Sequence, residues 1–496
     1  MIKNIKYKYL IASLVAVLGV SCMDDKGNYD YSDINEVQFV GETDDFKVTR
    51  FENLVITPEL NFTKDESASG NYAYRWEVFE NRLSGGTELE LLSTERDLDA
   101  TIALKPGGYF LYLTVTDLET GIEFQRQFDL DVINSTFEGW LVLSEVNGGS
   151  RLDMVSNLET GYTVLNNVLG GSGLNLEGAP DFLYTYAYNS TMYGVYVSTE
   201  GNGTTKIDPD TFDWVEPYGI GYEFIPQKAS NFKVDNLLSN SGWSSYAVAN
   251  GDAYFYYSVQ RISYGAPINR ISNETFSVSP MVARGTPGSY MIFYDTTNKR
   301  FVRSRRGVFS VMPEAASTLF DYNNVGMDLV YMEGNEYNSS NGAATFAVLQ
   351  DPTNSKYYFT YFNSSNNAQL HYGEMVGATD INLATQFAVS PEYGYLFYVV
   401  GNKVYQYDFS IGKTTLVLDN GNKEISFIKF HDFWANTKYE AFSKLLIVGS
   451  YDSAGAEGEN GTLDFYSILP LNAGLDLQTS YSGFGKIKSV TYRERS

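Results

Sequence analysis

The sequence predicts an all-β protein in which a small strand-rich domain precedes a larger domain of repeated strands. Aromatic residues make up 15% of the 496 residues, with 40 Tyr and 31 Phe, and there are 44 Gly. This composition favours strands and tight turns over helices. No segment of twelve or more residues keeps a convincing helical period, apart from a short helix expected near residues 378–385.

The charge balance and the rare residue types exclude several functional classes. The chain has 60 acidic and 35 basic residues, which gives a formal net charge of −25. Nucleic acid is therefore not an expected partner, because phosphate binding needs clustered Lys and Arg. One Cys and two His exclude a disulfide framework and any zinc site built on several of these ligands.

Residues 1–21 have the pattern of a signal peptide. Lys3, Lys6 and Lys8 precede an apolar run over residues 9–20, which is too short to span a bilayer. The run ends at Gly19-Val20-Ser21-Cys22, and Cys22 is the only cysteine of the chain. This ending resembles a bacterial lipobox, which implies that the Cys22 thiol is diacylated and anchors the protein through its lipid.

Residues 22–32 are expected to form a polar, lipidated tether. Asp24 and Asp25 follow Cys22 almost directly. Such an acidic pair resembles the signal that sends lipoproteins of the Bacteroidetes to the outer face of the outer membrane. The resemblance therefore implies a lipid-anchored protein that faces the cell exterior.

Residues 33–134 break into short alternating strands. One strand is expected over 72–78, with Tyr72, Tyr74, Trp76 and Val78 on one face, and others over 109–117 and 124–132. Glycine-containing turns at 105–108 and 120–121 separate them. About a hundred residues of this texture are typical of an immunoglobulin-like β-sandwich.

These strands resemble a known domain pattern. A Tyr-x-Trp strand, then Gly-Gly-Tyr-x-Leu-x-Leu-x-Val-x-Asp from Gly107 to Asp117 and a last strand after a glycine turn, is similar to the polycystic-kidney-disease (PKD) domain. With Asp25-Lys26-Gly27-Asn28-Tyr29-Asp30-Tyr31, the chain resembles PKD-like lipoproteins of the Bacteroidetes. The resemblance implies a surface lipoprotein that accompanies a SusC/SusD-type pair, a TonB-dependent importer with its substrate-binding lid. It implies a spacer role for the sandwich and no catalysis.

Residues 137–496 repeat a hairpin signal. Asn-Gly pairs, which favour two-residue hairpins, occur at residues 147–148, 202–203, 250–251, 341–342, 420–421 and 460–461. Aromatic and β-branched strands lie between them, and the 360 residues would suffice for seven or eight four-stranded units of about 45 residues. We therefore expect a β-propeller of about seven blades, closed by a strand over 486–493. A jelly roll or further sandwiches remain the structural alternatives.

No catalytic constellation is predicted. Neither His371 nor His431 has a metalloprotease-like partner, and no Gly-x-Ser-x-Gly elbow is present. A pair of carboxylates of the glycosidase kind stays open, because 60 acidic residues offer many choices. No cofactor is expected, although a glycine-rich loop is a candidate for structural calcium through Asp452, Glu457, Glu459 and Asp464.

Five side chains are candidates for ligand binding. Trp243 and Trp434 lie in polar, turn-like surroundings, where an aromatic face can stack on a sugar ring or a peptide side chain. Arg303, Arg305 and Arg306 form a basic cluster suited to a carboxylate, although they equally fit the solvated face of a strand.

The expected function is that of a non-enzymatic outer-membrane surface lipoprotein. It would bind an oligosaccharide or oligopeptide, or dock on a SusC/SusD-type importer, to assist nutrient uptake. The alternatives are a propeller glycoside hydrolase or lyase and a structural adhesion scaffold. Sequence does not distinguish sugar from peptide.

Overall fold

The computed structural model describes residues 34–495, apart from 42–44, 51, 66, 81–88, 105, 159–160, 187–193, 242, 258–262, 286–289, 316–317, 339–342 and 435. Strands account for 54% and helices for 4% of the chain, which confirms the predicted all-β class. The chain divides into two compact units, an N-terminal unit of Met1–Ile102 and Gly107–Asp131 and a C-terminal unit of Ala103–Pro106 and Val132–Ser496. The predicted signal peptide, the tether and Cys22 lie outside the described residues.

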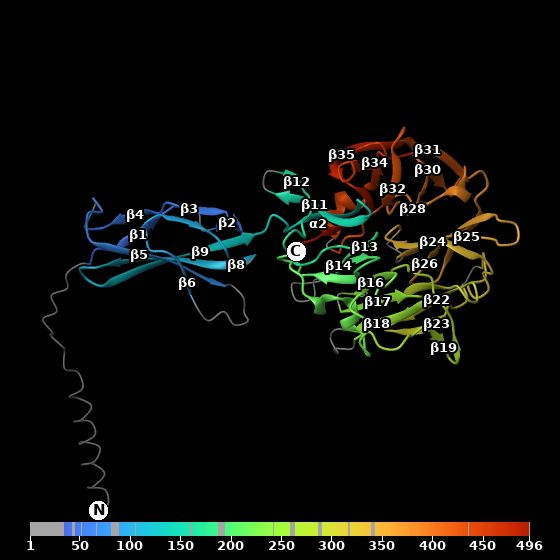
Figure 1. Cartoon of the computed structure of the whole chain (residues 1–496), viewed down its shortest axis with the longest axis horizontal. Coiled ribbons are helices and arrows are strands. Elements are labelled where there is room, and N and C mark those ends of the chain that lie inside the picture. The colour runs from blue at the N-terminus through green and yellow to red at the C-terminus, as the bar shows by residue number, and fades with distance from the viewer. Residues whose placement is uncertain are drawn as a thin grey trace, which may run out of the picture. The chain divides into compact units, whose positions relative to one another are not determined.

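The N-terminal unit contains one larger and two smaller sheets among its described residues (Figure 1). The larger sheet has the order β2 (Asp45–Thr49), β9 (Ile122–Ile133), β8 (Gly107–Asp117), β5 (Tyr72–Glu80) and β6 (Glu90–Ser93). The smaller sheets pair β1 (Val37–Val40) with β4 (Glu59–Phe62), and β3 (Asn53–Ile56) with β7 (Leu98–Thr101).

The core of this unit lies on the face that the alternating pattern predicts. Trp76 and Val78 of β5 are fully buried, and the Trp76 ring stacks on Phe128 of β9 with centroids 6.0 Å apart. The rings of Phe62 in β4 and Tyr72 in β5 lie 4.2 Å apart, so a smaller sheet packs on the larger one. Every second residue of a strand faces one side, which makes this core readable from the sequence.

The described part of the C-terminal unit forms seven sheets of three or four strands and the short pair β19 (Arg270–Ile271) and β20 (Glu274–Thr275). The first three sheets hold β10 (Gly139–Val146), β11 (Gly149–Leu158), β12 (Gly161–Leu165) and β36 (Lys486–Arg493); β13 (Pro180–Tyr186), β14 (Gly194–Thr199) and β15 (Gly203–Ile207); and β16 (Asn236–Ser241), β17 (Ser244–Ala249) and β18 (Asp252–Tyr257).

The fourth and fifth sheets hold β21 (Met291–Asp295), β22 (Arg300–Arg305) and β23 (Val308–Val311), and β24 (Asp328–Asn335), β25 (Ala344–Gln350), β26 (Tyr357–Asn363) and β27 (Gln369–Glu374). The last two hold β28 (Gln386–Val389), β29 (Leu396–Val400), β30 (Lys403–Asp408) and β31 (Lys413–Asp419), and β32 (Glu424–Lys429), β33 (Leu446–Tyr451), β34 (Gly461–Leu469) and β35 (Gly474–Phe484). In Figure 1 the strands β13, β16, β24, β28 and β32 lie toward the middle of this unit, whereas β18, β31 and β35 lie further out.

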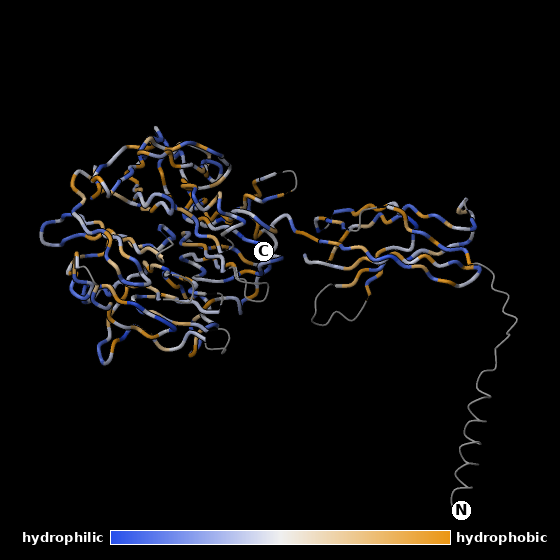
Figure 2. The backbone as a smooth tube through the Cα atoms, turned by 180° about the vertical axis from the view of Figure 1, so that it is seen from behind, coloured by the Kyte–Doolittle hydropathy of each residue, from blue (hydrophilic) through white to orange (hydrophobic). Residues whose placement is uncertain are grey.

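Hydrophobic clusters join these sheets in chain order. Each sheet shares a buried cluster with the next one, and the seventh shares one with the first. In β10, Leu141 and Leu143 face the second sheet, whereas Trp140 and Val142 face the seventh. A strand buried on both faces needs apolar residues throughout, which explains its unbroken Trp-Leu-Val-Leu run. Figure 2 shows hydrophobic and hydrophilic residues mixed along the chain of both units.

The last strand of the chain joins the first strand of the C-terminal unit. β36 pairs antiparallel with β10, with Trp140 opposite Tyr492. The fully buried Arg493 donates hydrogen bonds to the carbonyls of Thr136, at 2.6 Å, and Phe137. The strand expected over 486–493 therefore exists and completes a sheet whose other strands lie more than 300 residues earlier.

Two of the Asn-Gly pairs form the hairpin turn that they favour. Asn147 and Gly148, with φ of 51° and 71°, connect β10 to β11, and Asn250 and Gly251, with φ of 53° and 80°, connect β17 to β18. Positive φ at both central residues is the geometry of a type I′ turn. The pair at 341–342 lies outside the described residues.

Helices are few in the described chain: η1 (Glu216–Tyr218), η2 (Ile220–Glu223), η5 (Ile381–Leu383) and α2 (Asn436–Ser443). η5 lies within the interval 378–385 where a short helix was expected. α2 was not predicted, because its eight residues are too few for a helical period to stand out. None of the helices in the described part of the chain has the length and apolar character of a membrane span.

Candidate ligand-binding cavity

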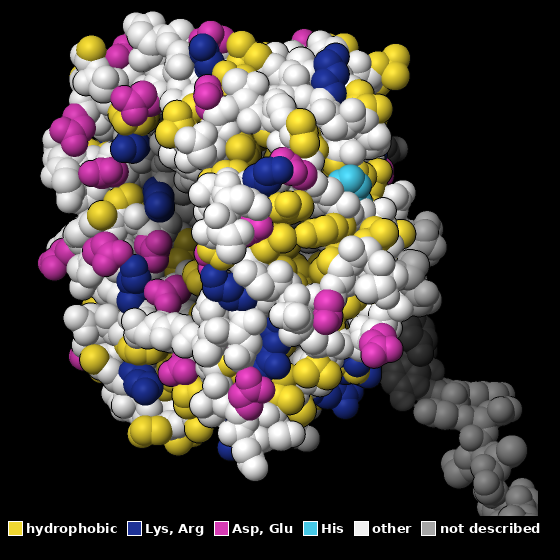
Figure 3. All heavy atoms as spheres, turned by 90° about the vertical axis from the view of Figure 1, so that its right-hand side faces the viewer, with side chains coloured by type: hydrophobic (Ala, Val, Ile, Leu, Met, Phe, Trp, Pro, Cys, Tyr) yellow, Lys and Arg dark blue, Asp and Glu magenta, His cyan; other side chains and the backbone are white. Residues whose placement is uncertain are grey.

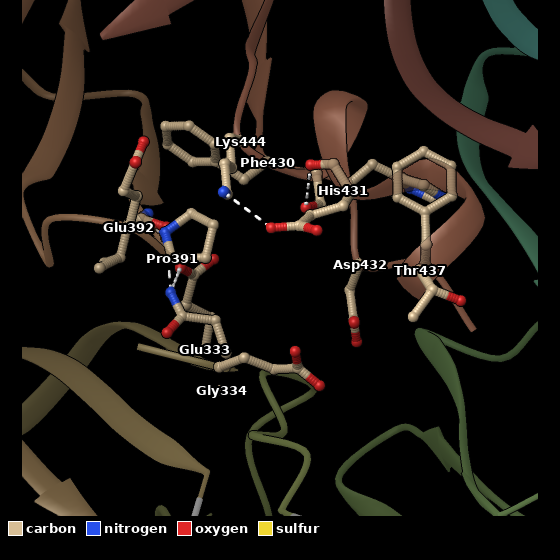
Figure 4. Close-up of a pocket in the computed structure, with 15 residues that line it drawn as sticks. Glu333, Gly334, Pro391, Glu392, Phe430, His431, Asp432, Thr437 and Lys444 are labelled. Carbon is tan, nitrogen blue, oxygen red and sulfur yellow. Dashed lines mark hydrogen bonds and ion pairs between the residues drawn. The ribbon is translucent and has the colours of Figure 1, made fainter. Parts of the chain in front are cut away.

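The strands at the middle of the C-terminal unit line a cavity of about 340 Å³, which we call the axial cavity. Residues of β13, β16, β24, β32 and β36 contribute to it, together with Val282 and Arg284. A second cavity of about 300 Å³ shares five of its residues, namely Glu333, Gly334, Phe430, His431 and Asp432. In Figure 4, Glu333 and Gly334 lie on one side of this second space and His431, Asp432 and Thr437 on the other.

An ion pair and an aromatic ring meet in the axial cavity. Arg284 forms an ion pair with Asp432, and its guanidinium lies 5.6 Å from the centre of the Trp434 ring. The Trp434 backbone N–H donates to the Glu494 carboxylate at 2.7 Å, which fixes this segment to the end of β36. The Asp432 side chain is 41% exposed and the Arg284 side chain 15%. The carboxylate can therefore accept hydrogen bonds from a ligand while it stays paired.

Glu333 is a buried carboxyl group in the same cavity. It accepts hydrogen bonds from the Tyr331 hydroxyl, from the Val389 backbone N–H at 2.9 Å and from Asn335 Nδ2 at 3.3 Å. Burial outweighs these bonds and raises the pKa of Glu333 from 4.5 to about 7. Glu333 thus changes its charge near neutral pH.

Lys429 and His431 bring basic groups to the cavity. Burial lowers the pKa of Lys429, and burial together with the charge of Lys429 lowers the pKa of His431 well below its usual range. The neutral His431 accepts a hydrogen bond from the Tyr492 backbone N–H at Nε2, 3.3 Å away. Its proton then resides on Nδ1, for which the described residues offer no partner.

The structure places one of the predicted binding residues in the cavity. Trp434 lines it and is partly buried, between β32 and α2. Trp243 lies in the turn between β16 and β17, is 43% exposed, and does not line the axial cavity. Of the two predicted tryptophans, the structure therefore brings only Trp434 to the axial cavity.

The basic cluster lies on another hairpin. Arg303 and Arg305 of β22 both approach the Tyr290 ring, at 3.9 and 5.7 Å from its centre, and Arg306 occupies the turn to β23 with a φ of 51°. Arg303 also donates to Ser310 Oγ at 3.3 Å. These arginines fit the solvated face of a strand, and the structure does not bring them to the axial cavity.

The calcium candidates make contacts within the protein. The Asp452 carboxylate accepts the Ala454 N–H at 2.9 Å, Glu457 accepts the Asn147 N–H at 2.6 Å, and Asp464 is buried within β34. No group of three or more His, Cys, Asp or Glu side chains gathers as a metal site within the described residues. His371 lies on β27, where burial lowers its pKa.

Most of the cavity residues could not be predicted from the sequence pattern. Glu333 lies within β24, and Arg284 lies in the segment between β20 and β21. Lys429 ends β32 and Asp432 follows it, so these side chains come from positions far apart in sequence. One local signal could have indicated a cavity residue: Lys429 is a charged residue at the end of the apolar run Ile-Ser-Phe-Ile. Figure 3 shows acidic and basic side chains interspersed over one face of the molecule, without an extended basic area there.

Comparisons with known proteins support the expected PKD-like resemblance for part of the chain. A model of the PKD-like family matches residues 22–206. The structure of a quinonprotein alcohol dehydrogenase-like protein from Bacteroides thetaiotaomicron is 11% identical, covers 92% of this chain and 97% of that chain, and gives a TM-score of 0.42. The structure of dihydro-heme d1 dehydrogenase is 10% identical, covers 72% and 75% of the two chains, and gives a TM-score of 0.34. Likeness at this level carries no argument about activity.

No curated protein sequence matches the chain at a significant level. The family match begins at the expected lipid-anchor position and extends beyond residue 134, where the resemblance seen in the sequence ended. It includes the N-terminal unit and the first strands of the C-terminal unit, up to β15. Residues 22–206 are thus similar to the PKD-like family, as the strand pattern had indicated.

Proposed function

We propose that this chain is a lipid-anchored surface protein that binds a nutrient ligand, an oligosaccharide or oligopeptide, in the axial cavity and assists a SusC/SusD-type importer. The cavity carries the proposal. It combines the Trp434 ring and the exposed Asp432 carboxylate with the ionisable side chain of Glu333. A small number of polar groups in a concave site is the usual composition of a ligand pocket.

The proposal includes the architecture that forms the cavity. We infer that the seven sheets are the blades of a β-propeller and that the axial cavity lies along its central channel. The chain of seven shared clusters and the β10–β36 pairing support this inference. A ring of blades brings the innermost strands of the sheets to one axis, where loops can build a binding site.

The binding test compares two tryptophans. Trp434→Ala removes the ring beside Arg284, whereas Trp243→Ala removes an exposed ring that does not line the cavity. We expect the first variant to weaken binding of the oligosaccharide or oligopeptide found by array screening by about tenfold, because loss of one aromatic contact costs about 1 kcal/mol or more. The second variant should leave the affinity unchanged. Equal affinities for both variants would contradict the proposal.

The partner is tested separately. The protein would be purified from detergent-solubilised membranes under mild conditions, and co-purifying proteins would be identified by mass spectrometry. Recovery of a TonB-dependent importer supports the accessory role. Recovery of none, together with ligand binding in the cavity, would restrict the proposal to binding alone.

One observation favours a second candidate function. Glu333, whose pKa is raised to about 7, shares a cavity with the more exposed Asp432. Glycoside hydrolases use one protonated carboxyl group as the general acid and one ionised carboxylate as the base or nucleophile. Release of reducing ends from a polysaccharide panel, abolished by both Glu333→Gln and Asp432→Asn, would establish this enzyme. The absence of product would exclude this enzyme and leave ligand binding as the proposed function.

A further inference from the structure

A further concave site lies on the C-terminal unit and shares Leu237 with the axial cavity. Its volume is about 540 Å³, and the two sites have no charged residue in common. We call it the tyrosine cleft. Five tyrosines line it: Tyr186, Tyr196, Tyr218, Tyr222 and Tyr256. They come from the second and third sheets and from the segment of η1 and η2 between those sheets.

Two of these rings differ from core tyrosines in their exposure. Tyr222 is 36% exposed, and its hydroxyl donates to the Glu216 carboxylate at 2.8 Å. Tyr218 is partly buried, and the Lys206 ammonium lies 5.8 Å from the centre of its ring. Neither ring belongs to a hydrophobic cluster of the interior described above. Rings held at a cleft in this way offer flat faces to a ligand.

A charged pair is part of the cleft lining. Lys206 Nζ lies 2.9 Å from Glu223 Oε1, and the Tyr196 hydroxyl donates to the same carboxylate at 3.0 Å. The Glu223 side chain is 17% exposed and the Lys206 side chain 34%. A carboxylate has about four acceptor positions and an ammonium has three N–H donors. The pair therefore keeps capacity to accept from and donate to the hydroxyl groups of a ligand.

The charges select the class of ligand. The Lys206–Glu223 pair is neutral as a whole, and Asp208 also lines the cleft, so an anionic ligand would meet a carboxylate. These groups give the lining one net negative charge, but the Lys206 ammonium already occupies the position beside the Tyr218 ring where a cationic ligand would bind. A neutral, hydroxyl-rich molecule with a flat apolar face meets neither repulsion. Pyranose rings have these properties.

We propose that the tyrosine cleft is a second binding site, for a neutral oligosaccharide, with Tyr218 and Tyr222 stacking on sugar rings and Lys206 and Glu223 hydrogen-bonding to sugar hydroxyls. This proposal rests on the proposed role in ligand binding but not on the axial cavity. It commits to sugar where the proposed function allows sugar or peptide.

The test titrates the purified protein with neutral hexasaccharides of glucose, mannose, xylose and galactose by calorimetry. We expect one of them to bind, and Tyr218→Ala and Tyr222→Ala each to weaken binding by about tenfold. Tyr218→Phe and Tyr222→Phe keep the rings and should stay within about threefold of the unmodified protein. Unchanged unfolding midpoints would show that the alanine variants are folded. If Tyr218→Ala does not fold, Tyr222→Ala still tests the proposal, because Tyr222 is exposed.

Other outcomes separate this proposal from the proposed function. Absence of hexasaccharide binding overturns the cleft assignment, and so does binding that Trp434→Ala weakens while Tyr222→Ala does not. That second result would still support ligand binding in the axial cavity. An oligopeptide whose binding depends on Tyr218 and Tyr222 would overturn the assignment to sugar. Hexasaccharide binding that depends on the two tyrosines and not on Trp434 supports a separate cleft site.

Discussion

Replacing Glu333 by Gln should change how the stability of the C-terminal unit depends on pH. Burial raises the pKa of Glu333 from 4.5 to about 7 in the folded state. The folded state therefore binds more protons than the unfolded state between these two values, and stability falls as pH rises through this window. A tenfold change in proton affinity is worth about 1.4 kcal/mol, so the ionised Glu333 costs about 3 kcal/mol above pH 7.

The variant removes this cost because Gln does not ionise. Its amide oxygen can still accept the hydrogen bond of the Val389 N–H, which Glu333 now receives. Relative to the unmodified protein, Glu333→Gln should gain about 3 kcal/mol of unfolding free energy between pH 5 and pH 8.5. The absolute difference at pH 5 depends on how well Gln replaces the protonated acid, so the change with pH is the quantity to compare.

The assay is urea unfolding at half-unit steps from pH 5 to pH 8.5, followed by tryptophan fluorescence. Four of the five tryptophans, namely Trp140, Trp214, Trp243 and Trp434, lie in the C-terminal unit and report on it. Trp243→Ala, which introduces no ionisable group, should differ from the unmodified protein by the same amount at every pH. A pH-independent difference for Glu333→Gln as well would refute the argument that burial sets the pKa of this carboxyl group.

Three further predictions concern the core, the closing strand and the anchor. Trp140→Ala, which empties the centre of the cluster between the seventh and first sheets, should destabilise the C-terminal unit by about 3–5 kcal/mol in urea unfolding, whereas Trp243→Ala at an exposed turn should cost less than about 1 kcal/mol. Deleting residues 486–496 removes the partner of β10 and the buried Arg493, so the cooperative unfolding transition of this unit should be lost; a preserved transition would show that the β10–β36 pairing is dispensable. Cys22→Ser should abolish labelling by radioactive palmitate in growing cells, and an unmodified protein that stays unlabelled would refute the lipid anchor.

Local sequence pattern was sufficient for much of the N-terminal unit. Trp76 and Val78 alternate with polar residues, and the structure buries both. The Asn-Gly pairs at 147–148 and 250–251 likewise form two-residue hairpins, because the turn depends only on the conformations of these residues. α2 and the smaller sheets were missed, since short elements carry too little periodic signal.

The residues of the axial cavity could not be predicted in the same way from local sequence pattern. Trp434 was recognised by its polar neighbours, but nothing near it in sequence identifies Arg284, which lies 150 positions earlier and contacts its ring. Arg303 and Arg305 were grouped correctly along one strand face, yet the structure supplies Tyr290 as their neighbour and does not bring them to the cavity.

The sequence by itself determined the strand-forming class, the Asn-Gly turns at 147–148 and 250–251 and the excess of acid, because these depend on residue type and on neighbours a few positions away. The tertiary structure decided which sheets are adjacent, that β36 completes the sheet of β10, and that Glu333, Lys429 and His431 share one cavity. The proton affinity of Glu333 belongs to the second group, since burial among residues from distant strands sets it. Desolvation is a property of the assembled fold and has no counterpart in the local order of the chain.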